Sequence, residues 1–298
     1  MSTHQIFHHS HRLAPDASGV LIDITREQAG WPLIDFTVRQ IAAGHRWEDE
    51  TGGEERCLVL LAGDCRLRWN GGASHRLGPR EHVFASYPHA AYLPPGVRFA
   101  IEADARTEIA DCGAPSSSAH PARVIRPEDC GDEIRGGGNA TRQIIDILPP
   151  SAAADRLLIC EVFTPGGNWS SYPPHKHDVD APPGEVDLDE VYYFRMRAPE
   201  GYGFQRLYTA DGSIDDTYKV VDGDLLLIHE GYHPFVTAYG YDAYYFNVLA
   251  GSRRSMAASD DPRYAALRAS WPPPDPRLPV VPRPAGHGMR GRRSGEAR

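Results

Sequence analysis

The chain has 298 residues, of which 41% are hydrophobic and 24% are charged, and its formal net charge is −9. This composition is ordinary for a globular protein, and the length suggests about two domains of roughly 150 residues each. The acidic balance argues against nucleic acid and anionic membrane surfaces as partners. An acidic small molecule is not excluded, because a few local arginines or lysines suffice to bind one carboxylate.

The sequence has none of the features of a secreted or membrane protein. Its five cysteines are widely spread, odd in number and without a CxxC pair, so neither a disulfide framework nor a zinc ribbon is predicted. The first residues lack the apolar core of a signal peptide, and no stretch approaches the ~18 apolar residues of a membrane helix. We therefore expect a cytoplasmic protein without a membrane segment.

Short apolar runs bounded by Gly, Pro, Asp and Asn recur along the chain and predict an all-β fold. In the first half, the run 57–69 is expected to form two strands joined by a turn at Gly63 and Asp64. Further strands are expected at 82–87, 90–96, 97–103 and 107–112. The polar, Pro-containing segment 113–123 then ends this first unit or forms a loop at its edge.

The second half repeats this β-rich texture after a Gly-rich loop at 126–142. Strands are expected at 142–148, 156–169, 190–196, 203–208, 217–221, 224–229, 234–239 and 243–250. The repetition predicts two β-barrels, one over residues 1–125 and one over residues 126–270. The Pro- and Arg-rich segment 271–298 is too biased to bury a core, so we expect an extended or disordered tail.

The stretch YPPHKHD predicts a metal site in the second barrel. In a strand, His175 and His177 point to the same face, about 7 Å apart, and together they can bind one metal ion. Glu190 begins a later strand, and His233 follows a glycine turn, so a meander would return both beside the histidine pair. His229 competes with His233 for the fourth position. Three histidines with one carboxylate suit Zn²⁺, Mn²⁺, Fe²⁺, Ni²⁺ or Co²⁺.

Other histidines near the start of the chain have no supporting strand in this prediction. They are expected to lie on a solvated arm, and they are His4, His8, His9 and His11.

The order of HxH, a later Glu and a later Gly-turn His resembles the metal signature of cupins. A narrower resemblance, to the 5-deoxyglucuronate isomerase family of myo-inositol catabolism, covers roughly residues 15 to 262. It is carried in the second half by YPPHKHD, DEVYYFR, GFQRLYTADGSIDDTY, DGDLLLIHEGYHPF and GYDAYYFNVLAG, and in the first half by GPREHVFASYPHAAYLPPG. His229 departs from this pattern, because the family usually has proline there.

The resemblance implies a bicupin with its metal in the C-terminal barrel and an N-terminal barrel that lacks a metal site. It also implies conversion of 5-deoxy-D-glucuronate to 2-deoxy-5-keto-D-gluconate, an aldose–ketose isomerisation through an enediol. The expected partner is therefore a small sugar acid. Assembly of several copies of the chain stays open.

The isomerisation needs a base that reaches the proton on C2 and a cation that holds the substrate carboxylate. The candidate bases are Tyr208, Tyr232, Tyr244, Glu230 and Asp242, and the sequence does not choose among them.

Arg206 is the preferred carboxylate ligand, because it shares a strand face with Phe204 and Tyr208. Lys176 and Arg142 are the weaker options for this role.

Three other functions compete with this interpretation. A 4-deoxy-5-ketouronate isomerase of pectin breakdown would use the same metal logic, although DGSIDDTY and GYDAYYFNV favour the first reading. An Fe²⁺-dependent cupin dioxygenase would use similar ligands but would require O₂. A sugar-acid-binding cupin would bind its ligand without turnover, and a barrel fold alone does not decide among these functions.

Overall fold

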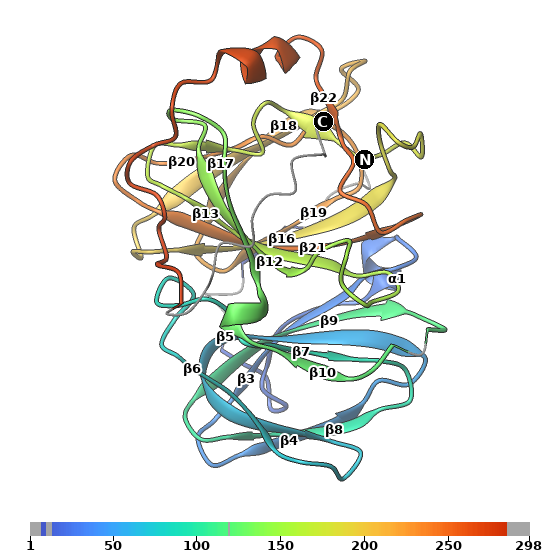
Figure 1. The fold of residues 1–298 in the computed structure, drawn as a ribbon. Helices are drawn as coiled ribbons and strands as arrows, with labels where there is room; N and C mark the ends of the chain where they lie inside the picture. The colour runs from blue at the N-terminus through green and yellow to red at the C-terminus, as the bar shows by residue number, and fades with distance from the viewer. Residues whose placement is uncertain (1–6, 10–13, 119, 285–298) are drawn as a thin grey trace.

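The structure, a computed structural model, describes residues 7–9, 14–118 and 120–284. Almost all of its regular structure is β-strand, as predicted, and Figure 1 shows two strand-rich units stacked one above the other. The described helical pieces are short: α1 (Arg26–Ala29), η2 (Pro127–Asp129) and η3 (Ala265–Ser270). None of the helices in the described residues has the length and apolar character needed to cross a membrane.

The N-terminal unit is built from strands within residues 20–125. Six strands are hydrogen-bonded in the order β10-β7-β5-β9-β3-β2. Of the other three, β6 and β8 pair with β5, and β4 pairs with β8. The strands are β2 (Val20–Ile24), β3 (Asp35–Ile41), β4 (Arg46–Glu50), β5 (Glu54–Trp69), β6 (His75–Arg80), β7 (Ala90–Leu93), β8 (Arg98–Ala103), β9 (Thr107–Pro115) and β10 (Arg123–Ile125).

The C-terminal unit pairs a seven-stranded sheet, β1-β19-β16-β21-β13-β12-β11, with a four-stranded sheet, β14-β20-β17-β18, and the short pair β15-β22. Its strands are β1 (Phe7–His9), β11 (Gly131–Arg135), β12 (Arg142–Leu148), β13 (Leu158–Thr164), β14 (Trp169–Ser170), β15 (His175–Lys176), β16 (Leu188–Met196), β17 (Tyr202–Tyr208), β18 (Asp215–Val221), β19 (Asp224–Ile228), β20 (Phe235–Thr237), β21 (Ala243–Gly251) and β22 (Ser259–Asp260). β11 lies within the segment that the sequence predicted to be a loop.

The prediction of two strands at 57–69 is wrong, because β5 runs through Gly63 without a turn. Gly63 has φ +106° and lies at a register shift in the pairing of β5 with β6. A Cβ there would lie 2.5 Å from the Arg106 carbonyl oxygen, so only glycine fits. The strand bends at this point and takes part in both faces of the barrel, pairing with β7 and β9 before it and with β6 and β8 after it.

The predicted strand at 82–87 is also wrong, because this segment forms turns. Its apolar side chains Val83, Phe84 and Tyr87 are buried, which explains the strand-like pattern. The Arg80 guanidinium donates hydrogen bonds to the carbonyls of Val83 and Ser86, so these groups are satisfied without a neighbouring strand.

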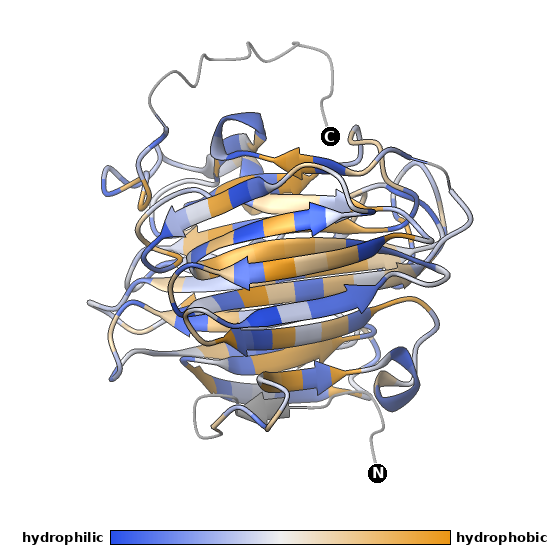
Figure 2. Ribbon diagram, turned by 90° about the horizontal axis from the view of Figure 1, so that it is seen from below, coloured by the Kyte–Doolittle hydropathy of each residue, from blue (hydrophilic) through white to orange (hydrophobic). Residues whose placement is uncertain are grey.

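Strands of the seven-stranded sheet bury both faces, one against the N-terminal barrel and one inside their own barrel. On β21, Tyr244 and Phe246 belong to the core between the two barrels, whereas Tyr245 belongs to the core inside the C-terminal barrel. On β16, Tyr193 belongs to the core between the barrels and Tyr192 to the core inside the C-terminal barrel. Figure 2 shows hydrophobic and hydrophilic residues alternating along many of the strands. Neighbouring residues on these strands therefore pack into different cores, one between the barrels and one inside the C-terminal barrel.

A buried ion pair crosses the interface between the barrels. The Arg80 guanidinium donates two hydrogen bonds of 2.8 Å to Glu161, and the Tyr244 hydroxyl donates a third to the same carboxylate at 3.0 Å. The Arg80 and Glu161 side chains are both 0% exposed. Their charges are therefore compensated only while the two barrels stay together.

The Pro-rich segment after residue 270 is extended, as expected, but its described part, residues 271–284, packs against the C-terminal barrel. Val281 is fully buried in the inter-barrel core, and its backbone makes two hydrogen bonds to the Gln143 side chain. Asp275 accepts hydrogen bonds from Asn168 and Arg277. The expectation that this segment contributes to no core is therefore wrong for its described part. Residues 285–298 lie outside the described residues.

The N-terminal end of the described chain also joins the C-terminal barrel. β1 pairs antiparallel with β19, with Phe7 opposite Leu226 and His9 opposite Asp224. His8 and His9 therefore belong to a strand, whereas the sequence predicted an arm without one. His4 and His11 lie outside the described residues.

Candidate metal centre

Three buried side chains from separate segments meet inside the C-terminal barrel. His177 follows β15, Glu190 lies on β16 and His233 precedes β20. One ligand atom of each lies within 4.8 Å of the other two. The Glu190 Oε2 atom is 3.0 Å from His177 Nε2 and 3.5 Å from His233 Nε2. Two imidazoles and a carboxylate in this arrangement form a donor set that suits a divalent metal ion.

Backbone carbonyls orient the histidine rings. His177 Nδ1 lies 2.8 Å from the Leu188 carbonyl oxygen, and His233 Nδ1 lies 3.0 Å from that of Gly231. If Nδ1–H donates to each carbonyl, Nε2 keeps its lone pair and faces the cluster. His233 Nε2 is buried and has no hydrogen-bond partner in the described residues. An unpaired buried acceptor beside a carboxylate fits a metal ligand.

Two amide side chains hold the cluster from outside. Asn247, on β21, donates a hydrogen bond to the second carboxylate oxygen of Glu190. Gln205, on β17, donates to the carbonyls of His233 and Pro234, at 2.5 and 3.2 Å. These contacts fix the carboxylate and the turn that carries His233, as outer partners of metal ligands do.

His175 lies beside this cluster. Its ring centroid is 4.8 Å from that of His233, and its Nδ1 is 3.4 Å from the Pro173 carbonyl oxygen. The ring is thus held in the same manner as the other two. His229 points elsewhere: its Nδ1 is 3.5 Å from Asp189, and its ring packs 4.8 Å from Trp31 of the N-terminal unit. Of the two competing histidines, the structure brings His233 to the cluster.

Burial keeps two of these histidines uncharged. It lowers the pKa of His233 to about 4 and holds the pKa of His175 well below its ordinary value, with the neighbouring histidines adding to the effect on His175. Burial acts in the same direction on His177, but the hydrogen bond and charge of Glu190 outweigh it and raise the pKa of His177. Neutral imidazole is the form that binds a metal.

Two stacked tyrosines line the same interior, which we call the metal chamber and define by His177, Glu190, His233, Tyr192 and Tyr245. The Tyr192 and Tyr245 rings are parallel within 10°, with centroids 4.6 Å apart, and the Tyr192 ring lies 6.0 Å from that of His233. Burial raises the pKa of Tyr245 to about 12 and the pKa of Tyr192 well above its ordinary value. Both phenols therefore keep their protons at neutral pH and are able to donate a hydrogen bond.

Comparison with known proteins now places the chain. The model of the KduI/IolB family matches residues 7–267. A 5-deoxy-glucuronate isomerase of Geobacillus kaustophilus is 43% identical over 250 residues, covering 84% of this chain and 91% of that protein. The chain belongs to the KduI/IolB family. A 5-deoxy-glucuronate isomerase of Bacillus subtilis (strain 168) is 36% identical over 244 residues, covering 81% of this chain and 90% of that protein.

Solved structures agree with this KduI/IolB assignment. An IolB-like protein from Salmonella typhimurium LT2 superimposes with a TM-score of 0.81 at 37% identity, covering 85% of this chain and 96% of that one. Oxalate decarboxylase from Bacillus subtilis superimposes with a TM-score of 0.56 at 13% identity, covering 80% and 73%, so that likeness concerns the fold alone. The predicted all-β bicupin fold and the family resemblance read from the sequence are both confirmed.

The residues expected to bind the substrate carboxylate lie in different surroundings in this KduI/IolB protein. Arg206 is on the outer side of β17, where it forms two hydrogen bonds to Asp215 and stacks on Tyr208, so it does not reach the metal chamber. Lys176 pairs with Asp178 and Glu185. Arg142, the weaker candidate, is 3% exposed and lies at the start of β12.

The expected bases are not gathered around the cluster of His177, Glu190 and His233 either. Tyr244 lies between the barrels on Glu161. The Tyr208 hydroxyl donates to Asp261 at 2.6 Å, and the Tyr232 ring packs 5.2 Å from that of Tyr208.

Two acidic candidates also lie outside the cluster. Asp242 pairs with Arg197 at 2.9 Å. Glu230 is half-buried in the turn before Gly231.

Tyr192, Tyr245, Asn247 and Gln205 escaped the sequence interpretation. A signal for Asn247 and Gln205 was present, because each is a lone amide within an apolar strand, in AYYFNVLA and GFQRLY. The tyrosines carry no such signal, since aromatic residues on strands are usually packing residues.

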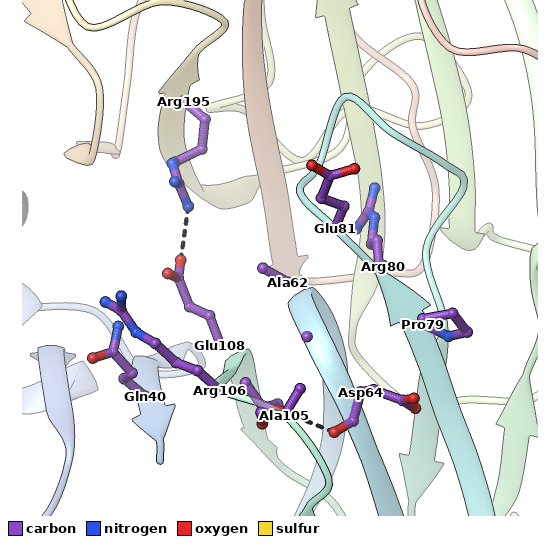
Figure 3. A pocket seen from close by; sticks show the side chains of 12 residues that line it. Gln40, Ala62, Asp64, Pro79, Arg80, Glu81, Ala105, Arg106, Glu108 and Arg195 are labelled. Atoms are coloured by element: carbon purple, nitrogen blue, oxygen red, sulfur yellow. Dashed lines mark hydrogen bonds and ion pairs between the residues drawn. The ribbon is translucent and has the colours of Figure 1, made fainter. Parts of the chain in front are cut away.

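A separate cavity of about 570 Å³ opens between the barrels, and His177, Glu190 and His233 are not among the residues that line it. Figure 3 shows that Arg195 points to Glu108 across it, and their atoms are 2.8 Å apart. Arg80, also in its wall, is already paired with Glu161. Because these charges compensate one another, the cavity is not assigned a role in catalysis.

Proposed function

We propose that this KduI/IolB protein is a metal-dependent 5-deoxy-glucuronate isomerase that converts 5-deoxy-D-glucuronate to 2-deoxy-5-keto-D-gluconate. The observation that carries the proposal is the 43% identity, over 84% of the chain, to a relative that bears this name. The buried His177, Glu190 and His233 cluster supports it, because aldose–ketose isomerisation develops negative charge on oxygen that a cationic site stabilises.

One divalent ion is proposed at this cluster, held by His177, Glu190 and His233 with His175 as a fourth ligand. Such an ion would supply Lewis-acid polarisation of the substrate carbonyl. The chain itself prepares the site: backbone carbonyls fix the rings, Asn247 fixes the carboxylate, and burial favours the neutral imidazoles of His175 and His233. Zn²⁺, Mn²⁺, Fe²⁺, Ni²⁺ and Co²⁺ all suit these donors.

The reaction moves the proton on C2 to the former aldehyde carbon, and the proton of the C2 hydroxyl to the former aldehyde oxygen. Tyr192 and Tyr245 keep their protons at neutral pH, so we assign them hydrogen-bond donation to substrate oxygens and not proton abstraction. Tyr244 is removed from the set of bases, because its hydroxyl is bound to Glu161 between the barrels.

Tyr208, Tyr232 and Glu230 stay predictions as proton carriers. Lys176 stays a prediction as a substrate ligand, although both of its ion pairs would have to open.

We also propose a division of the chain at residues 125–126 and 270–271, with the N-terminal barrel as a scaffold without metal. In support, β2 to β10 pair only with one another, and in the described residues the three-residue metal-type cluster lies in the second barrel. β1 is the exception, because it pairs with the second barrel.

The test combines metal analysis with a substrate assay. The purified protein is analysed for bound metal and then incubated without oxygen with 5-deoxy-D-glucuronate in D₂O, with ketone formation followed by NMR. We expect about one metal ion per chain and turnover with deuterium at the former aldehyde carbon. The variant His177→Ala should lose the metal. The matched control His229→Ala should keep it.

The result also separates the alternative functions. Turnover of 4-deoxy-5-ketouronate without turnover of 5-deoxy-D-glucuronate would overturn the proposal in favour of the other isomerase. Activity only when O₂ is admitted would indicate a dioxygenase, and ligand binding without any turnover would indicate a binding protein.

A further inference from the structure

Two arginines are buried in the described residues, and they differ in their partners. Arg80 is 1% exposed and is neutralised by Glu161. Arg142 is 3% exposed, yet no described carboxylate lies within ion-pair distance of it. Its Nη1 atom donates to the carbonyls of Tyr172, at 3.0 Å, and Ala140, at 3.4 Å. Burying a charge without a counter-charge is costly, so a counter-charge from outside the chain is the natural complement.

The position of Arg142 connects it to the metal chamber. Strand alternation places Gln143 against Val281 in the inter-barrel core, and it places Arg142 on the same side as Ile144, inside the C-terminal barrel. In addition to burial, the charge of Arg142 lowers the pKa of His175. The same charge opposes the rise that burial causes in the pKa of Tyr245.

The loop that Arg142 holds also leads into the chamber. Next to Tyr172, Ser171 forms a 2.8 Å hydrogen bond with the Tyr192 hydroxyl, and the Tyr192 ring faces His233. The guanidinium retains donors for a ligand as well, because Nε and Nη2 make no hydrogen bond to the described residues. A carboxylate is the group that a guanidinium binds with two parallel hydrogen bonds.

We propose that Arg142 binds the carboxylate of the sugar acid and so places the opposite, aldehyde end at the metal centre. This inference rests on the proposed function. In 5-deoxy-D-glucuronate the reacting carbons C1 and C2 lie at one end and the carboxylate at the other, about 6 Å apart in an extended six-carbon chain. A single cation that binds the carboxylate end fixes the direction of the substrate and selects uronates over neutral sugars.

The experiment compares Arg142→Met with Arg206→Met, a matched loss of one arginine on the outer side of β17. Both proteins are assayed with 5-deoxy-D-glucuronate and with the neutral analogue 5-deoxy-D-glucose. Binding of D-glucuronate and of D-glucose to each protein is measured separately by calorimetry. Metal content and thermal melting show whether each variant is folded and loaded, and Arg142→Lys tests whether charge alone restores binding.

We expect Arg142→Met to weaken binding of D-glucuronate and to raise KM for the acidic substrate by about 10- to 100-fold. Binding and turnover of the neutral sugars should change less than threefold, and Arg206→Met should behave as the wild type. Arg142→Lys should recover only part of the loss, because lysine lacks the two-pronged geometry.

Two failures are distinguishable. If the wild type does not turn over 5-deoxy-D-glucuronate, the proposed function fails, while the D-glucuronate titration still reports on Arg142. If the wild type is active and folded Arg142→Met keeps its preference for the acid over the neutral sugar, the inference about Arg142 is refuted alone. An equal loss for acidic and neutral sugars would also refute it, because it would indicate a purely structural role.

Discussion

Replacing Asn247 by leucine should weaken metal binding without touching any metal ligand. The Asn247 amide donates to the Glu190 oxygen that does not face His177, and the two residues are each 3% exposed. A buried hydrogen bond to a charged group contributes about 1.5–3 kcal/mol, and loss of an outer partner typically costs about 10- to 100-fold in metal affinity. We therefore expect Asn247→Leu to raise the metal dissociation constant by about 10- to 100-fold. Leucine has the same number of side-chain heavy atoms and the same branching at Cγ, so the core should remain packed.

The assay is a titration of the metal-free protein with Zn²⁺ or Mn²⁺ against a competing chelator of known affinity. Tyr244→Phe serves as the control, because it removes a hydroxyl from the same strand but from the side that faces the N-terminal barrel. Circular dichroism of the metal-free proteins confirms that both fold. A dissociation constant for folded Asn247→Leu within twofold of the wild-type value would show that Glu190 needs no such support, and it would refute the reasoning.

Glu161→Gln should lower the free energy of unfolding by about 3–5 kcal/mol, because it leaves the buried Arg80 without its counter-charge. Urea denaturation measures this loss, and a value below about 1 kcal/mol would contradict the prediction. The pKa of Asp275 is lowered from 3.8 to about 2, chiefly by its hydrogen bond to an arginine, so its contribution is complete above about pH 4 and is lost as the pH falls toward 2. Limited proteolysis with pepsin should therefore cut within 271–284 faster at pH 2 than at pH 4 in the wild type, and this acid-induced increase should be smaller in Asp275→Asn; equal increases would count against this role. Gly63→Ala should destabilise the fold by about 1–3 kcal/mol in the same urea assay, whereas Gly53→Ala, which has open space, should not; equal effects would refute the strain argument.

The sequence predicted the members of the candidate metal site better than its surroundings. His177, Glu190 and His233 stand in a recognisable order along the chain, so they were singled out as candidates, and the structure brings them together. Arg206 shows the limit of the same logic. Alternation shows which residues share a strand face, but only the packing of sheet against sheet decides which face is interior. Arg206 therefore lies outside on Asp215, and Arg142 lies inside.

Local patterns failed where tertiary contacts replace strand pairing. Glycine at position 63 looked like a turn, but here it lets β5 pass close to the backbone of Arg106 and Thr107. Strand β4 (Arg46–Glu50) gave no signal, because its RWEDE sequence is mostly exposed and has no apolar alternation. Its place is set by pairing with β8. Long-range pairing of this kind cannot be predicted from a short window of sequence.

The pairing of β1 with β19 links the order of synthesis to the order of assembly. Phe7 is made before the whole N-terminal barrel, yet its partner, Leu226, is made only after that barrel and much of the second one. At about 5–20 residues per second, the early segment waits some tens of seconds for its neighbour while the N-terminal barrel is free to fold without it. The strand that precedes the N-terminal barrel therefore joins its sheet only after that barrel has been made, and without it the edge of β19 would be open to other chains.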